Sequence, residues 1–337
     1  MNGRVLVMMS GGVDSSVAAA LLRDQGYDVT GVTLKLWGGE SDSGCCSVSD
    51  VEDARRVAAQ LGIPHYVFNF ADAFEDSVVS PYVDAYASGT TPNPCVECNR
   101  SVKFGRVLER AVQLGYDYVA TGHHARVIGG PALARATDPA KDQSYVLYML
   151  GPEELARTLL PVGELMKADV RAQAHERGLR TADKRESMDV CFIKRAGREA
   201  FLGARIGRRH GAIVDEQGEL VGTHNGIDAF TVGQRRGLGI AVGERRYVVD
   251  IDSEAARVTI GPPAALLRER VTLRDVHLHR DLPSPFVAQY RAHGPVAAAN
   301  LSGDDVVFED PQPRIAPGQV VAFYDGDICC GGGIVAA

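Results

Sequence analysis

In the first 121 residues, short apolar runs alternate with helix-forming stretches. This pattern predicts a parallel sheet with helices between its strands. Short apolar or β-branched runs predict strands at residues 5–7, 29–36, 65–70 and 117–121. Helix-forming stretches separate them, at residues 17–22, 49–61, 73–87 (interrupted by Pro81) and 99–114. Strands that alternate with helices are typical of an α/β fold with a doubly wound parallel sheet. Residues 143–178 continue with further predicted helices.

The pattern changes after about residue 195. Residues 211–221 carry a hairpin signal, and residues 247–251 and 258–261 are predicted as paired strands. From residue 271 onward short alternating strands recur, which indicates a small antiparallel β-barrel. We therefore expect a catalytic domain at residues 1–195, a small central domain at 196–263 and a C-terminal β-barrel at 264–337.

Composition favours a globular enzyme inside the cell. Hydrophobic residues make up 45% and charged residues 23% of the chain. No run approaches the roughly 18 apolar residues of a membrane span, and no signal peptide precedes the first strand, so we expect a cytoplasmic protein without a membrane partner. The seven cysteines, an odd number, are then expected to be reduced, catalytic or metal-binding. Net charge is −7, yet the basic run at 194–209 suits either nucleic acid or a solvated helix face.

A glycine-rich turn joins the first strand to the first helix. The turn contains Met8, Met9, Ser10, Gly11, Gly12, Val13, Asp14 and Ser15. Glycines allow close approach of the backbone to a phosphate, and the N–H groups at a helix N-terminus attract anions. The turn resembles S-G-G-x-D-S, the pyrophosphate loop of enzymes that split ATP into AMP and pyrophosphate. We expect Asp14 to hold loop N–H groups or Mg²⁺, although an ordinary β–α turn with a capping side chain would share this pattern.

Cysteines supply the second chemical signal. Cys95 and Cys98 have the spacing of half a zinc site, but no second C-x-x-C follows. Cys98 is predicted at a helix start, where the helix dipole favours the thiolate. Together with Cys191 and an ATP loop, it suggests that AMP activates an oxygen that sulfur then replaces. The alternative is that Cys98 and Cys191 are small buried apolar residues.

Several motifs occur in order along almost the whole chain. They are S-G-G-V-D-S at 10–15, T-P-N-P-C-V-E-C-N at 91–99, K-F at 103–104, T-G-H at 121–123, K-D-Q-S-Y at 141–145, D-V-C-F at 189–192, G-I at 226–227, T-V-G-Q-R-R-G-L at 231–238 and F-Y-D-G-D at 323–327. In combination they resemble the tRNA-specific 2-thiouridylase family.

The resemblance implies a pyrophosphate-loop domain, a small central domain and a C-terminal β-barrel. It also implies an ATP-dependent sulfurtransferase, a transferase of tRNA processing that replaces the C2 oxygen of the wobble uridine by sulfur. ATP with Mg²⁺ would adenylate that oxygen, and a persulfide on Cys191 would deliver sulfur. Cys98 would complete the exchange, leaving a Cys98–Cys191 disulfide. The implied partners are tRNA and a cysteine desulfurase or sulfur-relay protein.

The resemblance assigns further roles by position. Leu34 and Gly122 would contact the adenosine, and Asn93, Pro94 and Cys95 would approach the target base. The residues that would contact tRNA are His123, Lys141, Asp142, Gln143, Gln234, Gln289 and Tyr290, with His124 more structural. Two positions depart from the family pattern: Cys95 stands where some members carry Asp, and Gln289 precedes Tyr290 where Arg is common.

Three alternatives stay open. Cys95, Cys98 and Cys191 could hold a [4Fe–4S] cluster instead of carrying a persulfide, although we favour the reading without a cluster. An amide-forming synthetase with the same loop would not need Cys98 and Cys191. A tRNA-binding or sulfur-carrier module without turnover would not need the intact loop at 10–15.

Overall fold

The computed structural model describes residues 2–37, 48–186, 190–193, 197–240, 244–292 and 294–336. The chain forms two compact units. The first contains Met1–Val78, Cys95–Arg195 and Gly326–Cys330, and the second contains Val79–Pro94, Ala196–Asp325 and Gly331–Ala337.

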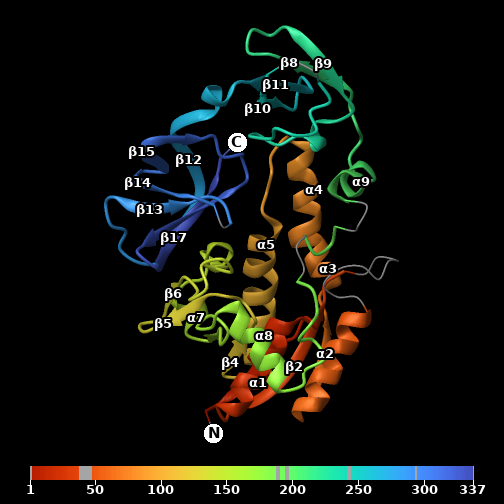
Figure 1. Ribbon diagram of the computed structural model, residues 1–337, viewed down its shortest axis with the longest axis vertical. Coiled ribbons are helices and arrows are strands. Elements are labelled where there is room, and N and C mark those ends of the chain that lie inside the picture. Colours follow the sequence, from red (N-terminus) through yellow and green to blue (C-terminus); the bar gives the residue numbers. More distant parts are fainter. Residues whose placement is uncertain are drawn as a thin grey trace. The chain divides into compact units, whose positions relative to one another are not determined.

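A parallel sheet forms the centre of the first unit (Figure 1). Its strand order is β3 (His65–Asn69), β2 (Asp28–Lys35), β1 (Arg4–Met8), β4 (Tyr118–Ala120) and β7 (Thr158–Leu159). All of its neighbouring strands pair in parallel. The first four strands confirm the prediction. β7 lies where we expected helix, because a strand of two residues is too short to carry a period of its own.

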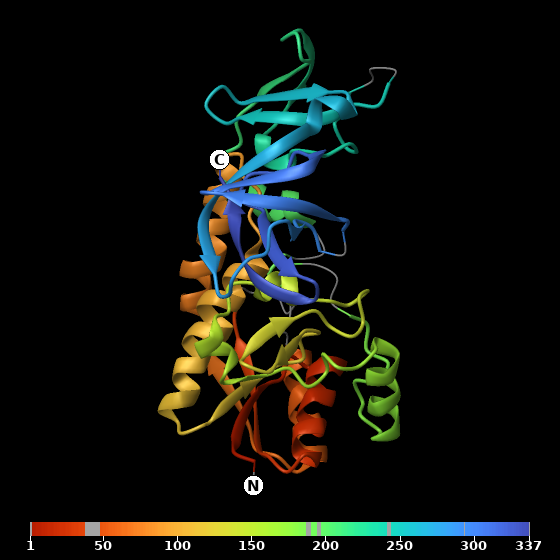
Figure 2. The ribbon, with the colours of Figure 1, turned by 90° about the vertical axis from the view of Figure 1, so that its left-hand side faces the viewer.

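Helices cover both faces of this sheet, as predicted for a doubly wound fold (Figure 2). α1 (Val13–Asp24), α2 (Val48–Leu61) and α8 (Lys167–Glu176) share one apolar core with alternate residues of β1. α6 (Val107–Gln113) packs against β4. Sheets of this kind bind ligands at the carboxyl ends of their strands. The loops that follow β1, β2 and β4 lie at this edge.

The helical stretch before β4 differs from the prediction. It begins at Pro94 with α5 (Pro94–Glu97) and continues as a π-helix, η2 (Cys98–Arg106), into α6. Proline is favoured at a first helical position, where its missing N–H is not needed. Cys95 therefore lies in the first turn, and the expectation that Cys98 starts the helix was wrong.

Pro81 likewise does not interrupt the helical stretch that precedes residue 88. α3 (Ala71–Phe74) continues into a π-helical turn, η1 (Glu75–Val79), and then into α4 (Ser80–Ala87), where proline occupies one of the first positions. The stretch at 126–159 adds a hairpin of β5 (Arg126–Ile128) and β6 (Ala132–Ala134). A 3₁₀ turn, η3 (Ser144–Leu147), and α7 (Pro152–Leu155) follow it.

The second unit contains a sheet with the order β10 (Tyr247–Asp252), β11 (Arg257–Gly261), β8 (Gly211–Val214) and β9 (Leu220–His224). β8 and β9 form the predicted hairpin, and β10 pairs with β11 as expected. α9 (Gly197–Gly203) and the turn η4 (Ile227–Ala229) belong to the same unit. Two arginines of the basic run are engaged locally: Arg205 lies over the Phe201 ring, and Arg208 donates to the Glu199 carbonyl.

The C-terminal strands form the predicted closed barrel (Figures 1 and 2). After the turn η5 (Pro263–Leu266), their order is β12 (Leu267–Leu278), β15 (Asp305–Pro313), β14 (Val296–Ser302), β13 (Phe286–Gln289), β16 (Val320–Asp325) and β17 (Ile328–Val335). β12 also pairs with β17, which closes the barrel. The strands enclose an aromatic and aliphatic core.

Candidate active site

The glycine-rich loop lies between β1 and α1 and is held by its own hydroxyl groups. Gly12 caps α1 with extended backbone angles, and Ser16 Oγ donates to the Gly12 carbonyl at 2.7 Å. Ser15 Oγ accepts a hydrogen bond from the Ser10 backbone N–H at 3.2 Å. These bonds turn the first N–H groups of α1 toward the space beyond β1, where an anion can bind.

Two glycines are required at this loop because other backbone lies against them. A Cβ on Gly11, which has φ +73°, would lie 2.3 Å from the Asp50 carbonyl oxygen. A Cβ on Gly122, at the end of β4, would lie 2.5 Å from the Ser15 nitrogen. No side chain fits at either position without moving the loop, so the loop and Gly122 form one compact site.

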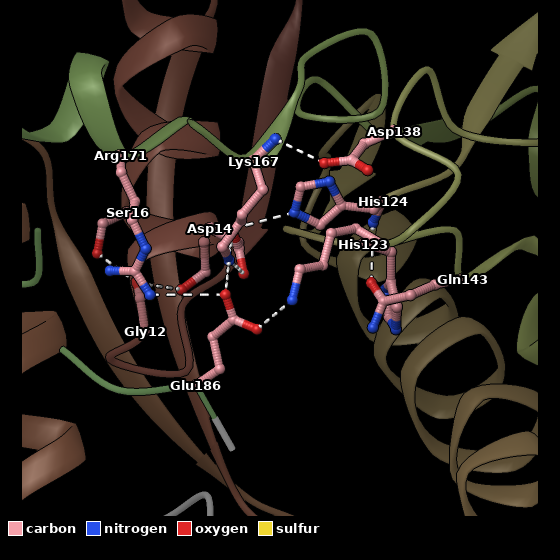
Figure 3. Close-up of polar contacts among 12 residues, drawn as sticks. Gly12, Asp14, Ser16, His123, His124, Asp138, Gln143, Lys167, Arg171 and Glu186 are labelled. Atoms are coloured by element: carbon pink, nitrogen blue, oxygen red, sulfur yellow. Dashed lines mark hydrogen bonds and ion pairs between the residues drawn. The ribbon is translucent and has the colours of Figure 1, made fainter. Parts of the chain in front are cut away.

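The carboxylate of Asp14 is bound by side chains from outside the loop. Lys167 Nζ donates to both of its oxygens, at 2.6 and 2.7 Å, and His124 Nε2 lies 3.1 Å from Oδ1 (Figure 3). Burial raises the pKa of Asp14, but hydrogen bonds from His124 and Lys167 outweigh burial and lower that pKa below its usual value. Asp14 is therefore a carboxylate that faces a buried ammonium group.

Lys167 is the main site residue that the sequence pattern did not indicate. It begins α8, where the helix dipole disfavours a cation, and only 11% of its side chain is exposed. Asp138 accepts the Lys167 backbone N–H at 2.9 Å and helps to fix the start of this helix. The surrounding helix, K-A-D-V-R-A-Q-A-H-E, is largely polar, so its sequence does not mark Lys167 as a site residue.

Glu186 extends the site beyond Lys167. Its carboxylate lies 3.1 Å from Lys167 Nζ and 2.7 Å from Lys141 Nζ, and Arg171 is 3.5 Å away. The hydrogen bond from Lys141 is the largest cause that lowers the pKa of Glu186. The predicted tRNA contact Lys141 is thus joined to the loop through Glu186, Lys167 and Asp14.

The other predicted contacts around β4 have defined neighbours. His123 Nδ1 lies 2.7 Å from Thr121 Oγ1, and burial together with the charge of Lys103 holds the pKa of His123 well below its usual value. Gln143 Oε1 accepts the His124 backbone N–H at 2.9 Å. Asp142 is buried, and its carboxylate pairs with Arg135 at 3.2 Å.

Other residues predicted to bind ATP lie at the same end of the sheet. Met8, Met9 and Leu34 are buried at the ends of β1 and β2. Thr33 Oγ1 donates to the Met9 carbonyl at 2.8 Å, and His65 Nε2 lies 2.9 Å from the same hydroxyl. Neither Thr33 nor His65 was predicted, and both fix the backbone beside the loop.

Both predicted catalytic cysteines belong to the first unit. Cys98 is 6% exposed in η2, and η2 packs against α3. Cys191 is partly exposed, and the next residue, Phe192, is buried against Phe74 of α3 and against Trp37 after β2. α3 therefore contacts the elements that carry each cysteine. Within the D-V-C-F motif, Asp189 lies outside the described residues.

The remaining predicted residues lie in the second unit. Gln234 holds a turn, since its Oε1 accepts the Thr231 N–H at 3.0 Å and its amide donates to the Arg236 carbonyl. Gln289 and Tyr290 are buried at the end of β13, and the Tyr290 hydroxyl lies 2.8 Å from Gln312 Oε1. Asn93 precedes α5, and buried Pro94 is its first residue.

Comparison with known proteins decides the family. A model described as a tRNA methyl transferase HUP domain matches residues 3–195, followed by a PRC-barrel domain model at 199–262 and an aminomethyltransferase β-barrel domain model at 268–335. Proteins named tRNA-specific 2-thiouridylase MnmA are 46% identical in Roseiflexus sp. (99% of each chain covered) and 48% identical in Frankia casuarinae (98% of each). The chain belongs to the tRNA-specific 2-thiouridylase family.

In this member of the 2-thiouridylase family, the candidate metal ligands among the described residues lie apart from one another. Among the residues that the structure describes, no three His, Cys, Asp or Glu side chains gather closely enough to hold a metal ion. Of the three thiols that a [4Fe–4S] cluster would need, Cys95 is exposed, Cys191 is partly exposed and Cys98 is buried. Every helix among the described residues is too short or too polar to cross a lipid bilayer.

Proposed function

We propose that this chain catalyses ATP-dependent 2-thiolation of the wobble uridine of tRNA. The observation that carries the proposal is the pairing of Asp14 with buried Lys167 at an intact pyrophosphate loop, in the same unit as Cys98 and Cys191. The names of the relatives support tRNA as the substrate. An amide-forming synthetase would have no use for the two cysteines.

Adenylation is the proposed first step. ATP would place its phosphates at the N-terminus of α1, with the loop from Met8 to Ser15, Leu34 and Gly122 around the nucleotide. The C2 oxygen of uridine attacks the α-phosphorus, and pyrophosphate leaves. Charge that develops on the leaving pyrophosphate would be stabilised by the loop N–H groups and by Lys167. Asp14 fits as one oxygen ligand of the Mg²⁺ that accompanies ATP.

Sulfur transfer is the proposed second step. A desulfurase or relay protein first supplies a persulfide on Cys191. Its terminal sulfur attacks C2, and AMP leaves with the former C2 oxygen. The Cys98 thiolate then attacks Sγ of Cys191. The bond between this Sγ and the sulfur on C2 breaks, and the latter sulfur stays on the base. The product enzyme carries a Cys98–Cys191 disulfide, which a reductant must open before the next turnover.

The proposed tRNA contacts extend through both units. Asn93, Pro94 and Cys95 would contact the target base. His123, Lys141, Asp142, Gln143, Gln234, Gln289 and Tyr290 would contact the rest of the tRNA. The partly exposed side chains of Lys141 and Gln143 suit direct contact, whereas buried Asp142 would act by holding its neighbours.

Cys95 provides a prediction that separates persulfide chemistry from cluster chemistry. Cys95→Ala should keep substantial thiolation activity, because only Cys98 and Cys191 exchange sulfur in the proposed steps. Anaerobically purified protein should contain neither iron nor sulfide in stoichiometric amounts. About four irons per chain, together with equal loss of activity in all three cysteine variants, would establish the cluster instead.

The function is tested by reconstitution. Purified protein, ATP with Mg²⁺, a persulfide source and unmodified tRNA are incubated, and the nucleosides are analysed by mass spectrometry. We expect 2-thiouridine at the wobble position only when ATP and persulfide are both present. Absence of this nucleoside under all of these conditions, with folded protein and intact tRNA, would reject the proposal.

A further inference from the structure

Glu186 connects two parts of the site that serve different substrates. One oxygen, Oε1, faces Lys167 at 3.1 Å and Arg171 at 3.5 Å (Figure 3). The other, Oε2, accepts from Lys141 at 2.7 Å. The side chain of Glu186 is 27% exposed, so the two lysines compete for a carboxylate that water only partly screens.

The segment that carries Glu186 is itself anchored. Arg171 of α8 donates to the Ala182 carbonyl at 2.7 Å, and Lys184 pairs with Asp50 at 2.6 Å and Asp53 at 2.7 Å, both on α2. The backbone before Glu186 is therefore tied to two helices, α8 and α2. Its carboxylate cannot follow a departing lysine far. A ligand that binds one lysine therefore changes how strongly Glu186 holds the other.

We propose that Glu186 is a positioning residue that couples nucleotide binding to tRNA binding, through its shared contact with Lys167 and Lys141. This inference rests on the proposed function, in which Lys167 faces the phosphates of ATP and Lys141 faces tRNA. None of the motifs that relate the chain to its family includes Glu186.

The coupling through Glu186 has a defined sign. Phosphates of ATP that draw Lys167 away leave Glu186 with Lys141 and the more distant Arg171, so Lys141 is held more firmly. A tRNA phosphate that takes Lys141 leaves Glu186 to Lys167 in the same way. With both ligands bound, the carboxylate keeps only Arg171. Each ligand therefore weakens the other through this residue, and linkage requires the two effects to be equal.

Replacement of Glu186 tests the coupling through binding. Glu186→Gln keeps the size of the side chain but removes the charge that holds the two lysines. Each ligand alone should bind at least as tightly as to the wild type, because neither must displace an ion pair. A residue with a merely structural role would instead weaken the binding of both ligands.

The test is a binding cycle on the full-length protein. The probes are an ATP analogue with a methylene group between the α- and β-phosphorus atoms and a tRNA transcript with an unmodified wobble uridine. The ratio of analogue dissociation constants with and without saturating tRNA measures the coupling. We expect that ratio to be about fivefold lower in Glu186→Gln than in the wild type. Lys141→Met should lower it equally, with no further change in the double variant.

Glu164→Gln is the matched control, since Glu164 is 64% exposed and its nearest cationic partner, Arg126, is 3.9 Å away. This variant should show the wild-type ratio. An unchanged ratio in Glu186→Gln, while wild type binds both ligands and thiolates tRNA, would overturn the inference and leave the proposed function standing. Wild-type protein that binds neither ligand would overturn both.

Discussion

Replacing Cys98 or Cys191 by alanine is expected to lower tRNA thiolation by at least about 10⁴-fold, as loss of a covalent nucleophile does in other enzymes. Cys191→Ala cannot carry the persulfide, and Cys98→Ala cannot release sulfur to the base. Single-turnover assays with sulfur-35-labelled persulfide should distinguish the two variants. The label should be absent from the Cys191→Ala protein and should form a stalled enzyme–tRNA adduct with Cys98→Ala.

The disulfide gives the same prediction a direct readout. After one turnover without reductant, peptide mapping of the wild type should find a bond between Cys98 and Cys191. Cys95→Ser, which changes an exposed cysteine of the same helical stretch, serves as the matched control and should form that bond. Alkylation of both thiols after product has formed would exclude the proposed exchange.

The second large effect is expected at the ion pair beneath the loop. Asp14→Asn and Lys167→Ala should each reduce tRNA-dependent AMP formation by at least about a hundredfold, the cost of losing one electrostatic contact with a developing charge. Binding of tRNA should be largely retained, because neither side chain is proposed to contact it. Pyrophosphate release and tRNA affinity are measured on the same preparations.

Two exposed residues of the first unit provide controls for these variants. Asp28→Asn removes a 52% exposed carboxylate that pairs with Arg4 at 3.6 Å, and Lys35→Ala removes an exposed ammonium at the end of β2. Both should retain wild-type rates. Normal pyrophosphate release by Asp14→Asn or Lys167→Ala would remove the loop from the mechanism.

The fold was largely predictable because its elements carry local signals. β1, β2 and β3 are apolar strands bounded by turn residues, and the hairpin of β8 and β9 has a Gly at its turn. The errors occur where tertiary contacts decide. Pro94 begins a helix that we expected at Asn99, and β7 is a strand only because it pairs with β4.

The active site likewise contains residues that the sequence predicts and residues that only the structure reveals. Met8 to Ser15 form one continuous motif, so the loop is visible in the sequence. Lys167 and Glu186 lie 153 and 172 residues after Asp14, and nothing in their local pattern indicates that they meet it. A buried ion pair between distant segments depends on the packing of α8 against α1, which only the three-dimensional structure provides.

Transfer of oxygen from the base to AMP tests the central claim most directly. A tRNA whose wobble uridine carries oxygen-18 at C2 is thiolated in ordinary water, and the released AMP is analysed by mass spectrometry. Adenylation of the C2 oxygen predicts AMP that carries one oxygen-18 for each 2-thiouridine formed. Unlabelled AMP, formed in step with 2-thiouridine, would contradict the account, because ATP would then activate some other group.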